Sequence, residues 1–282
     1  MNSRVNNQLA QTFNVNSLNE LTTITRSGTL HVAGVTTTPA TNVTVNGQTA
    51  AIYADDTFSK GGFSLADGNN TFTAIGNNAA GFSDTNTLTA NLPATNTLVY
   101  DLNGNLRTNG NQILEYDDEN QLVTNWVASA WKSEFVYDGA NRCRVQRDYQ
   151  WNTGTSGWVK TNEVRLFYDG VVVIQERDTS NAPLTSYTRS GSYLLARTDN
   201  SAASHAYYHT DGNRNVTALI NANQLIVAKY LYDPFGSTLA MSGPLAGANL
   251  YQFASLALSR ELRSQPLLAA RLLPGVTALH QP

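Results

Sequence analysis

Paired carboxylates are the first side chains in this sequence that could do chemistry. They occur at Asp55–Asp56 and at Asp117–Asp118–Glu119. A glycosidase needs two carboxyl groups across a cleft, roughly 5 to 9 Å apart. Adjacent residues on a strand point to opposite faces of a sheet, so neither pair suits that task. We expect these carboxylates to cap turns by accepting hydrogen bonds from backbone N–H groups.

Metal ligands are the second candidate chemistry. Two stretches, starting at Asp101 and Asp211, place Asp, Asn and Asn at alternate positions, like the first half of a calcium loop. Such a loop also needs Gly at its sixth position and Glu at its twelfth, and both stretches lack both residues. His205 and His209 have helical metal spacing but lie in a strand-like run, and Cys143 is the only cysteine. The sequence therefore predicts no metal site, no cofactor and no enzyme.

Aromatic side chains form a third group. Four tryptophans lie close together in the sequence, at Trp126, Trp131, Trp151 and Trp158. Exposed aromatics on a sheet can stack on sugar rings, whereas half-buried ones pack against cross-strand neighbours. The sequence leaves both interpretations open.

The composition indicates which elements must position these groups. Only 14% of the 282 residues are charged, against roughly 25% in typical domains, while Gly and Tyr are abundant at 20 and 13 copies. Asn, Gly and Asp favour turns and Thr and Tyr favour strands, so we expect an all-β chain with many short strands. A net charge of −3 offers no broad basic surface for nucleic acid. No apolar run is long enough to span a membrane, and the N-terminus lacks a signal peptide.

The first 93 residues divide into two parts. Residues 1–26 are a polar lead-in, in which the spacing of Leu18 and Leu21 allows a short helix. Residues 27–93 contain short alternating runs typical of a β-sandwich, and Asn46–Gly47 predicts a type I′ hairpin turn between them. The order of Val-Thr-Val-Asn-Gly and Leu-Ala-Asp-Gly-Asn-Asn-Thr-Phe-Thr-Ala resembles bacterial immunoglobulin-like modules. That resemblance implies a spacer or docking domain.

An imperfect repeat occupies residues 97–253. Each copy has a Tyr, usually followed by Asp, at the end of a strand-like run and before a Gly or Asn turn. The copies start at Tyr100, Tyr116, Tyr137, Tyr168, Tyr208 and Tyr232. We expect each Tyr to stack on the Tyr of the neighbouring turn, each Asp to cap its turn, and Gly or Asn to adopt the left-handed conformation. Stacked hairpins of this kind predict a long, curling antiparallel sheet.

Twelve residues carry these structural roles in the prediction. They are Tyr100, Asp101, Gly104, Tyr116, Asp117, Tyr137, Asp138, Tyr168, Asp169, Tyr232, Asp233 and Gly236.

These copies resemble the YD repeats of bacterial Rhs proteins, which teneurins also carry. The run from Tyr207 to Leu219, with Tyr230-Leu-Tyr-Asp-Pro-Phe-Gly236 and Asn249-Leu-Tyr-Gln-Phe253, is similar to the Rhs repeat-associated core. The resemblance implies a β-shell that spirals into a hollow vessel, which encloses a C-terminal toxin in some members and is displayed on the cell surface in others. It also implies the rest of the shell or a toxin as partner, and a secreted or surface location.

The tail at residues 254–282 departs from this pattern. It contains no Tyr, Asn or Asp but eight Leu and three Arg. Either a different module or a shifted reading frame would produce so abrupt a change. We therefore expect a fragment: an incomplete shell that acts as a non-catalytic scaffold for encapsulation or display. The alternative function is a carbohydrate-binding or adhesive module whose partners are cell-surface glycans.

Overall fold

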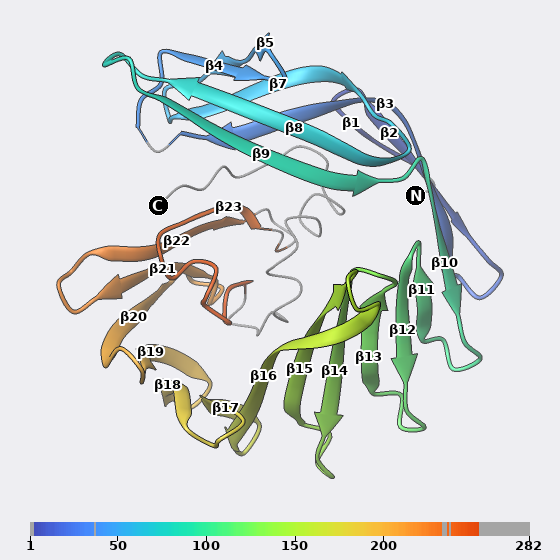
Figure 1. Cartoon of the computed structure of the whole chain (residues 1–282), viewed down its shortest axis with the longest axis vertical. Helices are drawn as coiled ribbons and strands as arrows, with labels where there is room; N and C mark the ends of the chain where they lie inside the picture. Colours follow the sequence, from blue (N-terminus) through green and yellow to red (C-terminus); the bar gives the residue numbers. More distant parts are fainter. Residues whose placement is uncertain (1–2, 37, 233–235, 237, 254–282) are drawn as a thin grey trace.

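The computed structural model describes residues 3–36, 38–232, 236 and 238–253 (Figure 1). This part of the chain is built from β-strands and contains no α-helix, so the all-β prediction is confirmed. The first nine strands are β1 (Ser3–Asn6), β2 (Leu9–Val15), β3 (Leu21–Val35), β4 (Asn42–Val45), β5 (Gln48–Thr49), β6 (Ala51–Ile52), β7 (Thr57–Ser64), β8 (Gly68–Asn77) and β9 (Ser83–Leu92).

The remaining strands follow the repeats. They are β10 (Thr95–Tyr100), β11 (Leu106–Asn109), β12 (Gln112–Tyr116), β13 (Leu122–Val127), β14 (Trp131–Tyr137), β15 (Cys143–Asn152), β16 (Gly157–Asp169), β17 (Val172–Arg177), β18 (Pro183–Ser190), β19 (Tyr193–Asp199), β20 (Ser204–Thr210), β21 (Val216–Asn221), β22 (Ile226–Tyr232) and β23 (Thr238–Ser242).

The strands from β10 to β23 form one meandering sheet. Each strand pairs antiparallel with the next along the chain, from β10–β11 through to β22–β23. Figure 1 shows these strands following one another around an arc, from green through yellow to orange. The predicted curling antiparallel sheet is therefore confirmed, and we call β10–β23 the repeat sheet.

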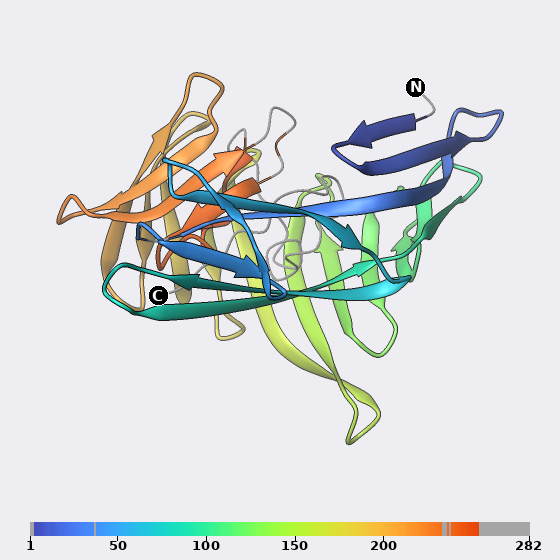
Figure 2. The same ribbon diagram turned by 90° about the horizontal axis from the view of Figure 1, so that it is seen from above.

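The long strand β3 joins the repeat sheet to the N-terminal strands. Its first half pairs with β2 on one edge and with β10 on the other, and its second half pairs with β7. The change of partner follows Gly28, which has a φ of +87° and lies where a Cβ atom would collide with the carbonyl of Gln8. In Figure 2, β3 runs from the N-terminal hairpin beside the green strands across to the other blue strands. It thus crosses the predicted boundary between residues 26 and 27.

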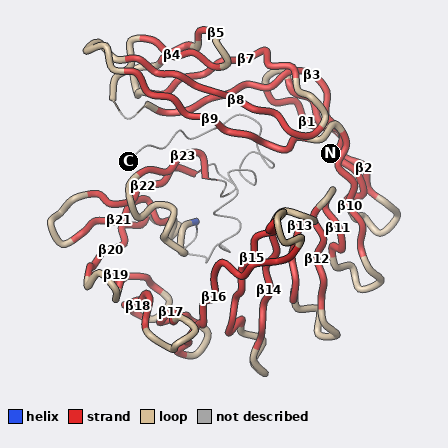
Figure 3. The backbone as a smooth tube through the Cα atoms, in the orientation of Figure 1, coloured by secondary structure: helices blue, strands red, loops and turns tan. Residues whose placement is uncertain are grey.

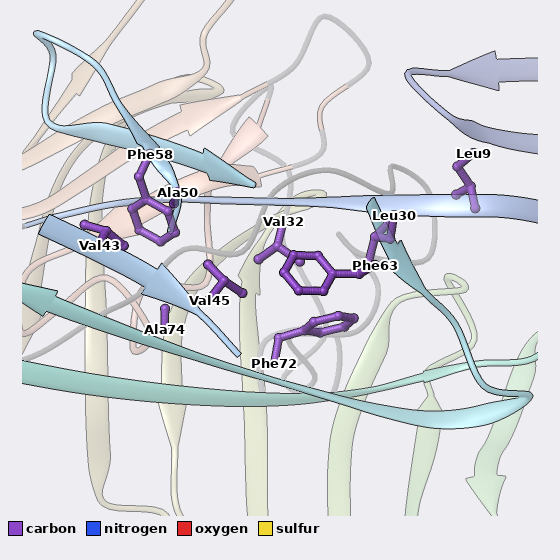
Figure 4. Packing of buried hydrophobic residues seen from close by; sticks show 10 residues of the cluster. All are labelled: Leu9, Leu30, Val32, Val43, Val45, Ala50, Phe58, Phe63, Phe72 and Ala74. Atoms are coloured by element: carbon purple, nitrogen blue, oxygen red, sulfur yellow. The ribbon is translucent and has the colours of Figure 1, made fainter. Parts of the chain in front are cut away.

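Residues from the second half of β3 to β9 form a two-layer sandwich. One layer contains β3, β7 and β6, and the other has the order β5-β4-β8-β9. Figure 4 shows the apolar side chains packed between the layers, including Val45, Phe58 and Phe72. Alternation along each strand sends these residues inward, as the sequence pattern indicates. The interpretation as an immunoglobulin-like module stays a prediction.

Two local expectations have different outcomes. Asn46 and Gly47 form the predicted hairpin turn, with φ angles of 47° and 75° between β4 and β5. The predicted helix around Leu18 is wrong. The Asn16 side chain accepts hydrogen bonds from the N–H groups of Leu18 and Glu20, and Asn19 has a φ of 64°, so this segment is a tight turn between β2 and β3.

Candidate functional site

The Tyr-Asp turns of the repeat sheet share one backbone design. In the first, Asp101 Oδ1 accepts hydrogen bonds from the N–H groups of Asn103 and Asn105, both at 2.9 Å, and Gly104 has a φ of 82°. Asp117, Asp138 and Asp211 bond the backbone two and four residues further on in the same way. The left-handed residues of those three turns are Asn120, Asn141 and Arg214.

The strand register also shifts at each repeat. Tyr100 pairs with Leu106 and Tyr116 with Leu122, in each case immediately after a β-bulge. The same shift occurs at Tyr137, Tyr168, Thr210 and Tyr232. A bulge bends a strand and increases its twist, so a bulge in every repeat makes the sheet curl.

The tyrosine hydroxyls connect one hairpin to the previous one. Tyr137 Oη donates to the carbonyl of Leu122 at 3.0 Å, and Tyr168 Oη donates to the carbonyl of Cys143 at 2.7 Å. Tyr232 Oη donates to Val216 in the same manner. Each of these acceptor residues is the strand partner of the bulge residue in the preceding repeat. The pairs are Leu122 with Tyr116, Cys143 with Tyr137, and Val216 with Thr210. Burial raises the pKa of Tyr137 and of Tyr168 to about 12, which keeps both hydroxyls protonated as donors.

We expected the ring of each repeat Tyr to stack on the Tyr of the neighbouring turn. Among the ring contacts of the described residues, this prediction is wrong. The guanidinium of Arg142, in the Asp138 turn, lies over the ring of Tyr168 instead, 5.1 Å from its centroid. Tyr232 packs with Tyr230 and Phe253. A repeat Tyr reaches the previous turn through its hydroxyl or through a cation, because successive turns lie one strand pair apart.

Side chains at the turn tips add a second set of connections. Asn105 Nδ2 donates to Asn120 Oδ1 at 2.7 Å, and Gln121 Nε2 donates to Asn141 Oδ1 at 2.8 Å. Arg142 Nη1 donates to the carbonyl of Gly170 at 2.6 Å. Hydrogen bonds from Arg142 lower the pKa of Asp138 to about 2. The left-handed Asn of one turn is therefore also the acceptor for the turn before it.

Some predicted repeat residues occupy other places. Asp169 ends β16 and pairs with Val172, so it belongs to the ladder and not to a cap. In the fifth repeat Thr210, and not Tyr208, stands at the bulge. Gly236 has a φ of +94°, and a Cβ there would lie 2.5 Å from the Phe253 ring. Asp233 and the tail at 254–282 lie outside the described residues.

Four further turns, which have no Tyr before them, are capped by an Asn or Asp that bonds the backbone four residues further on, and the Tyr-Asp pattern did not predict them. The capping residues are Asn16, Asn78, Asp178 and Asn221. The signal that could have found them is an Asn or Asp followed three residues later by a residue that tolerates positive φ. Asp55 behaves as predicted for the first carboxylate pair, since it accepts hydrogen bonds from the N–H and the hydroxyl of Thr57.

One face of the repeat sheet carries a row of polar side chains, which we call the polar ladder. The cross-strand register places on this face Asn96, Asn109, Gln112, Asn125, Ser133, Asp148 and Asn162. Ser133 Oγ and Asn162 Nδ2 both donate to the carboxylate of Asp148, each at 2.9 Å. Gln112 Nε2 donates to Asn125 at 2.8 Å, and Ser133 is fully buried. These hydrogen bonds run across neighbouring strands, whereas Asn96 Oδ1 is buried without a hydrogen-bond partner.

The same face continues to β17–β22, where it is covered by residues 243–253, the core segment. Figure 3 shows this loop after β23 lying inside the arc of strands, so we call this face the inner face. Tyr208 Oη donates to Asn249 at 2.8 Å, Arg197 Nη1 donates to the carbonyl of Ala248 at 3.0 Å, and the rings of Tyr187 and Tyr251 meet edge to face.

A buried acid lies beneath the core segment. Glu176 accepts a hydrogen bond of 2.6 Å from Tyr187 Oη. Burial raises the pKa of Tyr187 well above its usual value, so this phenol remains a donor. The contact fixes the ring of Tyr187 for its packing with Tyr251.

Other candidate groups are dispersed. The described residues contain no cluster of three His, Cys, Asp or Glu side chains able to hold a metal ion. His205 and His209 lie on β20 and bond Thr198 and Thr217 respectively. In the part of the chain that the structure describes, no helix is long and apolar enough to cross a membrane.

The pairing register separates the tryptophans. Trp131 lies on the inner face, and Trp126, Trp151 and Trp158 lie on the opposite one. Trp151 and Trp158 pair across β15 and β16, with their centroids 5.0 Å apart. Of the two interpretations of the tryptophans, packing against a cross-strand neighbour fits Trp151 and Trp158.

The repeated bulges, capped turns and curled single-layer sheet define a class of protein. The family described as Teneurin YD-shell matches residues 66–250, about two thirds of the chain. The chain belongs to the teneurin YD-shell family, and the resemblance inferred from the Tyr-Asp repeats is confirmed. The match begins just before β8 and so includes two sandwich strands as well as the repeat sheet.

Individual relatives match more narrowly. The chain is 30% identical over 143 residues to the tRNA3(Ser)-specific nuclease WapA of Bacillus spizizenii, a match that covers 49% of this chain and 6% of that protein. A crystal structure of TcdB2-TccC3 covers 89% of this chain with 12% identity and a TM-score of 0.45, and one of TcdB2-TccC3-Cdc42 covers 87% with 11% identity and a TM-score of 0.46. The chain spans 13% of each of those two chains.

Proposed function

We propose that this chain is a section of a YD-repeat shell that encloses or displays a polypeptide and has no catalytic role of its own. The observation that carries the proposal is the inner face. From β10 to β16 it is lined by the polar ladder, whose side chains bond one another. Apolar side chains lie between the ladder residues on the same face, among them Leu98, Trp131 and Phe135, so this wall offers an enclosed polypeptide both polar and apolar contacts.

The core segment supports the same proposal. It lies against the inner face of β17–β22 through buried contacts of Asn249 and Tyr251. A peptide segment of this chain is thus already accommodated on that face. The cargo we propose is a polypeptide C-terminal to the shell in the intact protein, with the rest of the shell as the second partner.

The relative in Bacillus spizizenii is named as a nuclease, and the matched region is a small fraction of it. We assign this chain to the shell and place any toxin activity in a segment beyond the matched region. A shell of this kind would act in a secreted or surface-displayed protein.

Photo-crosslinking tests the proposal with a matched pair of positions. The whole chain carries a C-terminal epitope-tagged unfolded extension, with a photoreactive residue either at Gln150, an exposed inner-face position opposite Trp131, or at Val136, an exposed position on the opposite face. We expect the extension to crosslink to position 150 and not to position 136. Equal crosslinking at both positions, or crosslinking only at 136, would reject enclosure on the inner face.

A further inference from the structure

One layer of the sandwich ends at β9, which pairs only with β8 among the strands that the structure describes. The layer order β5-β4-β8-β9 leaves the other edge of β9 without a partner among those strands, and we call it the open edge. The β8–β9 ladder runs through ten consecutive pairs, from Gly68↔Leu92 to Asn77↔Ser83, without a register shift. A strand without a bulge keeps its backbone groups in one regular row along its edge.

The hydrogen bonds of β8 show which residues of β9 face the open edge. The carbonyls of Thr73 and Asn77 accept hydrogen bonds of 2.8 Å from the residues that flank β4. The odd-numbered residues of β8 therefore direct their backbone groups to β4, and the even-numbered ones to β9. The register pairs even residues of β8 with even residues of β9. The odd-numbered residues of β9, from Ser83 to Asn91, thus direct their N–H and C=O groups to the open edge.

The open edge lacks the features with which sheets usually prevent the addition of another strand. Such features are bulges, prolines and charged side chains, lysine above all. β9 has no bulge, no Pro and no Lys, and its one charged residue is Asp84, beside the loop to β8. Asp84 Oδ1 accepts the N–H of Thr85 at 2.7 Å, so it covers only the beginning of the strand. From Thr87 to Asn91 no backbone hydrogen bond within the described residues reaches the open edge.

The side chains of β9 indicate what kind of strand would fit beside it. On one face, Thr87 and Thr89 pair their hydroxyls with threonines of β8, at 2.9 and 2.8 Å. On the other face, Leu88 and Ala90 point toward the sandwich core and are at least half-buried. A segment with hydroxyl side chains on one face and apolar ones on the other would continue both faces across the open edge. A charged segment would find no ion-pair partner on this part of β9.

The position of the open edge indicates where its partner comes from. In Figure 1, β8 and β9 follow one another toward the arc of repeat strands, so the open edge faces the space that the inner face also borders. From this placement we infer that the open edge binds an extended, uncharged segment of the enclosed polypeptide, which adds to the sandwich as a further strand. Backbone hydrogen bonds supply the affinity, and alternate side chains supply the selectivity. The inference rests on the proposed function, because it names where the enclosed polypeptide is held.

An edge turned toward the arc suits a segment already inside it better than it suits a second copy of the whole chain. The pairing of β9 with a second copy is therefore an outcome for the test to separate.

Amide hydrogen exchange measured by NMR tests the inference on three forms of the whole chain. One has no extension, one carries a C-terminal Gly/Ser linker that ends in an alternating Thr-Val segment, and one carries Pro in place of each Val, which cannot join a ladder. We expect the Thr-Val segment to slow the exchange of the Thr87 and Thr89 amides at least about tenfold, because the tether raises its local concentration. The amides of Leu88 and Ala90 bond β8 and are internal controls, which should be protected in all three forms.

A pair of variants tests the same edge from the side of the sandwich. Thr87→Pro removes a donor from the open edge without removing a bond to β8, so it should abolish the protection of the Thr89 amide. Thr87→Val keeps the N–H group and is the matched control, in which the protection should remain. Melting curves show whether both variants keep the sandwich. If Thr87→Pro does not fold, the Thr-Pro extension gives the same test on the unaltered chain.

Several results would overturn the inference. They are equal exchange of the Thr87 and Thr89 amides in all three forms, protection by the Thr-Pro extension, and protection that rises with protein concentration together with a dimer in light scattering. The last result would assign the open edge to a second copy. Crosslinking at position 150 with unprotected amides would reject the strand addition alone. Protected amides without that crosslink would reject enclosure on the inner face and support the strand addition.

Discussion

The sandwich and the first half of the repeat sheet are both antiparallel β-structures, yet different interactions hold them together. The sandwich has two layers around a cluster of buried apolar residues that includes Val43, Val45 and Phe58. Within the described residues the repeat sheet from β10 to β16 is a single layer, and its buried positions include Gln112, Asn125 and Ser133. One region depends on apolar burial, and the other on hydrogen bonds that recur in each hairpin.

This difference shows how a repeat can extend without a core. Each hairpin contributes a capped turn, a bulge, and in several repeats a tyrosine hydroxyl that bonds the previous hairpin. These contacts involve neighbouring hairpins only, so the design can be repeated along the chain. The sandwich needs two layers to meet and cannot be extended in this way. All four tryptophans lie in β13–β16, so tryptophan fluorescence reports on the repeat sheet alone.

The largest effect should come from the sandwich core. Phe58 is 1% exposed, and Phe58→Ala should destabilise the sandwich by about 3–5 kcal/mol because it removes buried area and leaves a cavity. Circular dichroism during denaturant unfolding should show an earlier transition while tryptophan fluorescence changes later. Phe82→Ala, at a position 73% exposed, is the control and should stay within about 0.5 kcal/mol of the parent. Equal shifts in both signals would mean that the two regions unfold as one unit.

The second effect concerns the junction between the regions. The Arg26 guanidinium donates to the carbonyls of Ala66, Leu92 and Pro93, which connects β3 to the chain segments on either side of β8 and β9. Arg26→Ala should cost about 2 kcal/mol, since it leaves several carbonyls without a charged donor. It should also separate the fluorescence and circular dichroism transitions further.

The control for Arg26 is Arg107→Ala, which removes an exposed arginine from β11. It should leave both transitions in place. If it shifts them as much as Arg26→Ala does, the loss of charge explains the effect and the carbonyl contacts do not.

A smaller effect is expected within the repeat sheet. Tyr168→Phe removes the hydroxyl that donates to the carbonyl of Cys143, and should destabilise the sheet by about 1 kcal/mol. The unfolding transition seen by tryptophan fluorescence should move to lower denaturant concentration. The transition of the sandwich, seen by circular dichroism, should not move. Tyr207→Phe, at a position 52% exposed on β20, should have no measurable effect. A null result for Tyr168 would mean that the hydroxyl does not connect the hairpins energetically.

Much of this architecture could be predicted from local sequence. Asp101 and Gly104 predict a capped turn, because an Asp side chain accepts hydrogen bonds from nearby N–H groups and Gly tolerates positive φ. Those rules act within a few residues and are therefore visible in the sequence. The Asn46–Gly47 turn was predictable for the same reason.

Contacts between hairpins could not be predicted in this way. The acceptor of the Tyr168 hydroxyl is 25 residues away, and its identity depends on the bulge at Tyr137 that sets the register. The face on which a charged side chain lies also depends on register, because a shift by one residue would turn Asp148 outward.

The smallest effect is a change of pH that acts on the repeat sheet. The hydrogen bond from Lys160, followed by those from Arg147 and Arg165, lowers the pKa of Glu163 to about 2. A carboxylate with a lowered folded-state pKa stabilises the fold above its unfolded pKa of about 4.5, and this stabilisation is lost as the pH falls toward 2. The Glu163 side chain is 6% exposed, but its three cations are 33–45% exposed and screened by solvent, so the loss should be below about 1 kcal/mol. Tryptophan-detected unfolding at pH 5 and at pH 3 should show a small loss of stability, and Glu163→Gln should reduce that difference. If Glu163→Gln has the same pH dependence as the parent chain, Glu163 does not contribute to the stability of the repeat sheet. The pH dependence would then be assigned to Asp138, whose pKa is also about 2.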